Sequence, residues 1–168
     1  ALLAIVVLAI IVRMGWPGLT EFKADEARLL SLAWDMAEWK YFPIRGISNS
    51  AGFANPPMAV WLYALPLFFW KHIYAATLYT GLLNVLSIIG AWWMARRYWG
   101  STAAIITTLL LTVNPWAIHH ARKIWAQNLI VPFVIGWAIC GLLVYVDKRK
   151  WFLIGHFLCI AIAIQAHL

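Results

Sequence analysis

The sequence has few charged residues and very little acid. Asp and Glu together number 6 of 168 residues, and 11% of the chain is charged against 64% hydrophobic. Soluble domains average about 25% charged and about 45–50% apolar residues, so the composition argues against a soluble protein and is typical of a membrane protein. Cysteine is also scarce. Cys140 and Cys159 both fall in apolar runs, where we expect them to pack as small apolar side chains rather than to form a disulfide.

Long stretches without Asp, Glu, Lys or Arg run through most of the chain. A transmembrane helix needs about 20 apolar residues. We therefore predict an all-α, polytopic integral membrane protein with about five transmembrane helices, in a single membrane domain over residues 1–168. The predicted spans are residues 1–12, 73–95, 101–118, 128–146 and 151–168. Because the first and last runs are still apolar at the ends of the chain, we expect a part of a longer multi-pass protein.

The net charge of +7 is divided among several short loops and forms no single basic stripe. We therefore expect the basic residues to contact membrane lipids and no nucleic acid. The short basic loops 95–100 and 147–150 are separated by two predicted spans, so they share one side, which the positive-inside rule makes cytoplasmic. Residues 16–55 then form a first outer loop of a multi-pass protein in the cytoplasmic membrane, with residues 119–123 on the same side.

This orientation requires that the aromatic-rich stretch 56–70 does not cross the membrane. The stretch is short, and Pro56, Pro57 and Pro66 interrupt it. Apolar stretches of about 10–14 residues are more often interfacial or re-entrant than spanning. We predict a short juxtamembrane helix here.

The few acids are concentrated in the first outer loop. Five of the six lie within residues 20–42, namely Glu21, Asp25, Glu26, Asp35 and Glu38. Over residues 24–41 the polar residues recur every three or four positions, which predicts an amphipathic helix lying flat at the membrane surface. A solvated surface accounts for its polar face, and Arg28 is spaced to pair with Asp25. It accounts less well for two adjacent acids at a lipid–water boundary, where a carboxylate can act as a general base or help to hold a divalent cation.

Several features occur in an order that resembles the N-terminal part of the family 39-type glycosyltransferases. These are polytopic membrane enzymes of the GT-C fold, similar to protein O-mannosyltransferases and to the lipid A aminoarabinose transferase. The features are Arg13 near the outer end of the first span, the pair Asp25 and Glu26, the pair Glu38 and Trp39, "NPP" from Asn55, "ARRYWG" from Ala95, "NPW" from Asn114 and "HHARKIWAQN" from His119.

The resemblance implies that a sugar moves from a polyprenyl-phosphate carrier to a hydroxyl of a protein, lipid or glycan acceptor, at the outer face of the cytoplasmic membrane. It implies that Asp25 is the catalytic base and that transfer inverts the anomeric carbon. Glu26 and Glu38 would orient the acceptor or a cation. Whether a divalent metal takes part stays open.

The donor site departs from the family pattern. Many relatives carry Glu-Lys before the two prolines, with the Lys on the carrier phosphate, whereas this sequence has Ala54 and Asn55. Another cation must then bind the phosphate. Arg122 is the first candidate, because a guanidinium can bind phosphate oxygens in a bidentate way, and Lys123 and Arg45 lie on the same predicted side.

Two other function classes stay open at this stage. The chain could be a non-catalytic structural or accessory subunit of a larger membrane complex, which the missing lysine favours. It could also be a pigment or haem protein, because an intramembrane His is a functional-site hypothesis by default. The candidate axial ligands are His119, His120, His156 and His167. The simpler interpretation is that His156 hydrogen-bonds a neighbouring helix, while His119 and His120 meet water at the interface.

Overall fold

The structure, a computed structural model, describes residues 2–48 and 52–167, so residues 49–51 of the predicted outer loop lie outside it. Among the described residues the regular elements are all helices, beside one isolated bridge between Ser48 and Ala54. The prediction of an all-α chain is confirmed. In chain order the helices are α1 (Leu2–Met14), α2 (Ala24–Ala37), α3 (Met58–Phe69), α4 (Ile73–Tyr98), α5 (Gly100–Val113), α6 (Pro115–Ala121), the 3-10 helix η1 (Ala126–Leu129), α7 (Ile130–Tyr145) and α8 (Phe152–Ala166).

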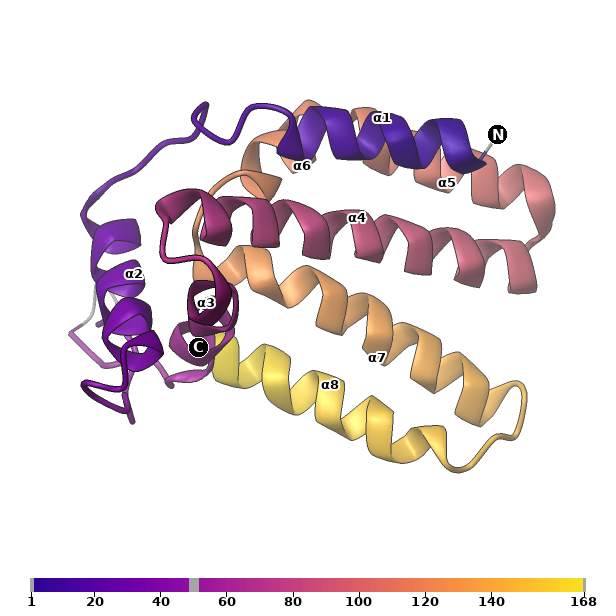
Figure 1. The fold of residues 1–168 in the computed structure, drawn as a ribbon. Helices are drawn as coiled ribbons and strands as arrows, with labels where there is room; N and C mark the ends of the chain where they lie inside the picture. The colour runs from indigo at the N-terminus through magenta and orange to yellow at the C-terminus, as the bar shows by residue number, and fades with distance from the viewer. Residues whose placement is uncertain (1, 49–51, 168) are drawn as a thin grey trace.

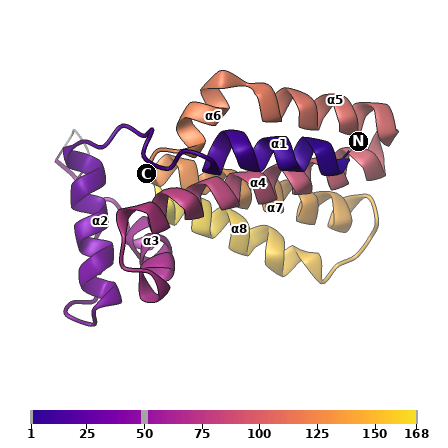
Figure 2. The ribbon, with the colours of Figure 1, turned by 45° about the horizontal axis from the view of Figure 1, so that its top comes forward.

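Five of these helices form an elongated bundle. Helix α4 lies at its centre and packs against α1, α5 and α7, and α8 packs against α7 (Figure 1). Helices α2 and α3 pack against each other at one end of the bundle, and the view in Figure 2 shows α3 between α2 and the long helices.

Among the described residues, two helical segments are long and apolar enough to cross a membrane. They are α4, with 26 residues, and the segment Ala126–Tyr145, with 20 residues. The bent pair α5 and α6 makes a third if it counts as one span. Helices α1 and α8 are apolar but have only 13 and 15 residues. The described part of the chain therefore has two or three candidate spans, and the five-span arrangement stays a prediction.

The predicted span over residues 101–118 is not one straight helix, because the chain bends by 63° between Val113 and Pro115, and its crossing of the membrane stays a prediction. Proline has no N–H, so the carbonyl of Leu111 loses its partner in the helix. The side chain of Asn114 then accepts from the backbone N–H groups of Trp116 and Ala117 at 2.9 and 3.1 Å and caps the new helix α6. A proline together with an N-cap residue thus accounts for the break in the helix within this apolar run.

The guanidinium of Arg13 occupies this break. It donates to the carbonyl of Leu111 at 2.6 Å and to the carbonyl of Thr112 at 3.1 Å. Carbonyls without a helical partner are costly in apolar surroundings. Arg13 therefore fastens the end of α1 to the end of α5.

The stretch 56–70 forms the short helix α3, as predicted. Its 12 residues span about 18 Å, well short of the roughly 30 Å of a bilayer core. Tyr63 and Leu67 of α3 are fully buried in a cluster that also contains Leu29 of α2 and Leu129 of η1. This cluster holds α2 and α3 against the end of the bundle.

Small residues allow α7 and α8 to approach closely. A Cβ atom on Gly155 would lie 3.0 Å from Sγ of Cys140, and one on Gly136 would lie 3.0 Å from Sγ of Cys159. Both cysteines are free, so the prediction of unpaired, packed thiols is confirmed. His156 also acts as predicted, because its Nδ1 donates to the carbonyl of Trp137 on the neighbouring helix at 3.0 Å.

The two ends of the bundle carry different loops. The end of α4 and the turn after α7 meet at one end, where Nε and Nη2 of Arg97 donate to Asp147 at 3.0 and 2.7 Å. Helices α2, α3 and α6 lie at the opposite end (Figure 1). The two basic loops thus share one end and the acidic helix lies at the other, as predicted. The assignment of these ends to the cytoplasm and the outside stays a prediction.

Candidate functional site

The acidic helix α2 covers residues Ala24–Ala37, so it ends earlier than predicted, with Trp39 in a left-handed conformation at a φ of 59°. Its first turn is anchored by Glu26. The carboxylate accepts from the backbone N–H of Lys23 at 3.0 Å, which satisfies one of the free donors at the start of the helix. Only 2% of Glu26 is exposed, so this acid points into the protein.

Lys123, from the segment after α6, is the partner of Glu26. Its Nζ lies 3.1 Å from Oε1 of Glu26 and 2.8 Å from Oε2 of Glu21, and it sits 4.3 Å from the ring centre of Trp125. Lys23 also pairs with Glu21. These four charges form an ion-pair network, which we call the Lys123 cluster (Glu21, Lys23, Glu26 and Lys123). It joins the first predicted outer loop to the 119–123 segment.

The ion pairs of the Lys123 cluster stabilise the ionised forms of Glu21 and Lys123. Hydrogen bonds from Lys123 and then from Lys23 lower the pKa of the Glu21 carboxyl to about 2. The same bond to Glu21 raises the pKa of the Lys123 ammonium above its ordinary value. Both groups are therefore ionised at neutral pH.

Asp25 stands next to Glu26 in the same turn but is not buried with it. It is exposed, and within residues 2–48 and 52–167 it has no hydrogen bond or ion pair, so the predicted pair with Arg28 does not form there. A negative charge in the first turn of a helix is favourable. The structure thus separates the two adjacent acids into a buried anchor, Glu26, and an open carboxylate, Asp25.

Glu38 lies at the other end of α2, as its C-cap residue. Its carboxylate is 2.5 Å from Lys40 and 3.6 Å from Lys71, and the hydrogen bond from Lys40 is the main reason that its pKa is lowered. The 14 residues of α2 cover about 20 Å. Asp25 and Glu38 are therefore not brought together in one site.

An apolar hollow of about 330 Å³ lies at the C-terminal end of α2. The ring of Trp39 packs 5.5 Å from that of Phe68, which ties the end of α2 to α3. The hollow is lined by Met36, Trp39, Tyr41, Phe42 and Phe68. Aromatic faces of this kind can contact lipid chains or sugar rings.

Two of the three predicted phosphate-binding residues are engaged by the protein itself. Arg122 donates twice to the carbonyl of Val12, with Nε at 2.9 Å, and its guanidinium lies 5.9 Å from the ring centre of Trp16. Lys123 belongs to the ion-pair network described above. Arg45 is exposed and, in the described part of the chain, has neither a hydrogen bond nor an ion pair.

The candidate metal and haem ligands have the following surroundings in the described part of the chain. No group of three or more His, Cys, Asp or Glu side chains that could hold a metal ion occurs among them. His156 bonds the carbonyl of Trp137, and Nε2 of His167 lies 2.5 Å from Nε2 of Gln127. His119 and His120 form ring contacts with Trp116.

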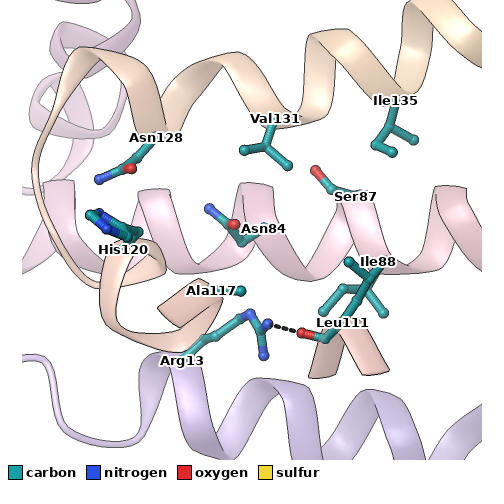
Figure 3. Close-up of a pocket in the computed structure, with 10 residues that line it drawn as sticks. All are labelled: Arg13, Asn84, Ser87, Ile88, Leu111, Ala117, His120, Asn128, Val131 and Ile135. Carbon is teal, nitrogen blue, oxygen red and sulfur yellow. Dashed lines mark hydrogen bonds between the residues drawn. The ribbon is translucent and has the colours of Figure 1, made fainter. Parts of the chain in front are cut away.

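Sequence reasoning missed a largely apolar cavity in the bundle that several polar side chains also line. It has a volume of about 160 Å³, and Arg13, Asn84, Ser87, His120 and Asn128 supply its polar lining (Figure 3). In the sequence, only the resemblance to the glycosyltransferases draws attention to Arg13. An arginine at the end of an apolar run is itself a signal of function in a membrane protein.

No protein family, curated protein or solved structure was found to match this chain.

Proposed function

We propose that the chain belongs to a polyprenyl-phosphate-dependent glycosyltransferase and that Asp25 is its catalytic base. The observation that supports this most is the contrast between Asp25 and Glu26. The buried ion pair of Glu26 with Lys123 fixes the first turn of α2, while Asp25 presents a free carboxylate from that turn. A base must be both accessible and held in place, because proton transfer requires hydrogen-bond distance to the hydroxyl.

In the proposed reaction the acceptor oxygen attacks the anomeric carbon of the sugar while Asp25 takes the hydroxyl proton. The bond between that carbon and the carrier phosphate breaks, and the polyprenyl phosphate leaves with the bonding electrons. Attack opposite the leaving group inverts the carbon. The amphipathic helix α2 would hold Asp25 at the lipid–water boundary, where a lipid-borne donor meets a water-borne acceptor.

The remaining predicted residues take different parts in this proposal. Glu26 is a positioning residue that acts through Lys123 and α2, rather than a ligand of the acceptor. Glu38, at the same end of α2 as the aromatic hollow, contacts the acceptor some distance from the base. The bundle lies in the cytoplasmic membrane with α2 outside and with α1, α4, α5–α6, α7 and α8 as its five spans.

A transfer assay tests the proposed function. The intact protein, purified in detergent, is incubated with a polyprenyl-phosphate sugar labelled in the sugar, with and without protein, lipid or glycan acceptors. We expect label to leave the carrier and appear on one acceptor class. If label stays on the carrier with every acceptor class and is not released to water either, the proposal is wrong.

A second candidate is a non-catalytic subunit of a larger membrane complex. The engagement of Arg122 by Val12 and of Lys123 by Glu21 and Glu26 favours it, because these cations then serve the fold alone. Under this alternative, Asp25→Asn and Asp35→Asn have equally small effects, and the protein co-purifies with partner subunits.

A further inference from the structure

The cavity in the bundle contains a buried positive charge without a counter-ion. Only 2% of Arg13 is exposed. Among the described residues each acid either pairs with another base or has no ion pair, so none neutralises Arg13. The charge of Arg122, which also acts on Arg13, has the same sign. An uncompensated buried charge is costly, so this site favours the binding of an anion.

Arg13 also has N–H donors that make no hydrogen bond. A guanidinium carries five N–H groups, and two of them bond the carbonyls of Leu111 and Thr112. The Nε atom is buried and has no hydrogen-bond partner. The two carbonyl bonds therefore fix the side chain without satisfying it, and they leave donors for a ligand.

Another part of the cavity wall, on α6, adds a second free donor. The ring nitrogens of His120 make no hydrogen bond within the described residues, although the ring packs 5.0 Å from that of Trp116. Asn84 and Ser87 already donate to carbonyls of their own helix, at 3.0 and 2.8 Å. Figure 3 shows Arg13 and His120 on the wall of the same space, from α1 and α6.

The cavity is large enough for a ligand of several atoms. Its 160 Å³ compares with the roughly 150 Å³ of an engineered cavity that binds benzene. Two apolar lining residues, Leu111 and Val131, are 37% and 40% exposed, which places part of the wall at the surface of the bundle. A ligand could thus enter from the side.

We propose that this cavity binds a phosphate group through Arg13 and His120. A phosphate oxyanion supplies both the missing negative charge and the acceptors that these donors lack. The phosphate could come from a lipid headgroup at the side of the bundle or from free phosphate in water. The identification of this phosphate as that of the sugar carrier rests on the proposed function. The proposal that the cavity binds a phosphate does not.

Calorimetric titration of the intact protein in detergent tests the site. Three ligands are compared: inorganic phosphate, farnesyl phosphate, and farnesol as the same lipid without the phosphate. We expect binding of at least one phosphate-bearing ligand and none of farnesol. Tighter binding of farnesyl phosphate identifies a lipid headgroup, and equal affinities identify free phosphate. Binding of farnesol as tight as that of farnesyl phosphate would overturn the proposal, and so would no binding of either phosphate.

Variants locate the binding in the cavity. Arg13→Gln should weaken phosphate binding about ten- to hundredfold, the value of lost charge-assisted hydrogen bonds. Arg13→Gln also frees the carbonyls of Leu111 and Thr112, which could disturb the fold. A second variant, Ser87→Leu, therefore fills the cavity while Arg13 is kept. Arg97→Gln makes the same change in charge at the other end of the bundle and should not alter the affinity.

Arg122→Gln distinguishes this site from the cation expected from the sequence. Loss of binding in Arg122→Gln, with unchanged binding in Arg13→Gln and Ser87→Leu, would overturn the proposal. The function and the site can also fail separately. Phosphate binding without sugar transfer refutes the proposed function alone, and transfer with unchanged carrier binding in both cavity variants refutes the site alone.

Discussion

The ammonium of Lys123 lies 3.1 Å from the carboxylate of Glu26, and this pair fastens the segment after α6 to the first turn of α2. The residue beside Glu26 is the exposed Asp25. Because the pair is buried, it fixes where on the bundle α2 begins. The position of the open carboxylate therefore depends on a contact between segments that are far apart in the chain.

We predict that Glu26→Gln lowers the stability of the protein. Breaking a buried ion pair costs about 3–5 kcal/mol, but Lys123 keeps Glu21 as a partner, so we expect a loss of up to about 3 kcal/mol. The melting temperature of the purified variant in detergent measures the effect.

The matched control is Asp25→Asn, which removes the neighbouring charge from the same turn. It should cost only the first-turn charge effect of about 0.3–1 kcal/mol. Equal melting temperatures for the two variants would show that Glu26 does not anchor α2.

The stabilising effect of Glu21 should depend on pH. Its pKa in the folded protein is about 2, below the ordinary 4.5, because Lys123 and Lys23 donate to it. A lowered folded-state pKa gives stability that is complete above the unfolded-state pKa and is lost as the pH falls through the folded-state value. The melting temperature of the parent should thus exceed that of Glu21→Gln at neutral pH, and the difference should disappear between pH 4.5 and 2. A difference that stays constant over this range would contradict the ion-pair network.

We predict that α2 faces outward and that the end of α4 faces the cytoplasm. In a protein lacking Cys140 and Cys159, single cysteines are introduced as Lys23→Cys and Arg97→Cys. An impermeant maleimide added to intact cells should label position 23 and leave position 97 unlabelled until the cells are opened. The reverse pattern would invert the topology and remove Asp25 from the outer face.

Much of the helical arrangement could be predicted, because it depends on local sequence. The apolar run 73–95 predicts α4 (Ile73–Tyr98) to within a few residues, and the proline content of 56–70 predicts the short helix α3. The break at Asn114 was missed because the apolar composition of 101–118 continues through it. Pro115 was visible there, but Arg13, which satisfies the freed carbonyls, comes from another helix.

The site was harder to predict, because its contacts join distant segments. The burial of Glu26 had a local signal, since Glu26, Leu29, Leu30 and Ala33 follow the i, i+3, i+4, i+7 spacing of one helix face and are all buried. Its partner Lys123 could not be identified from spacing. Nor could the cavity around Arg13, whose lining comes from several helices.

The most direct test of Asp25 as the catalytic base compares two substitutions on α2 in the sugar-transfer assay. Asp25→Asn removes the proposed base, and Asp35→Asn removes an acid of the same helix without a proposed role. General-base catalysis contributes about 10²–10⁴-fold, so we predict that Asp25→Asn lowers kcat by that factor while the melting temperature changes little. Asp35→Asn should keep the parental rate. Equal rates for the two variants would contradict the assignment of Asp25 as the base.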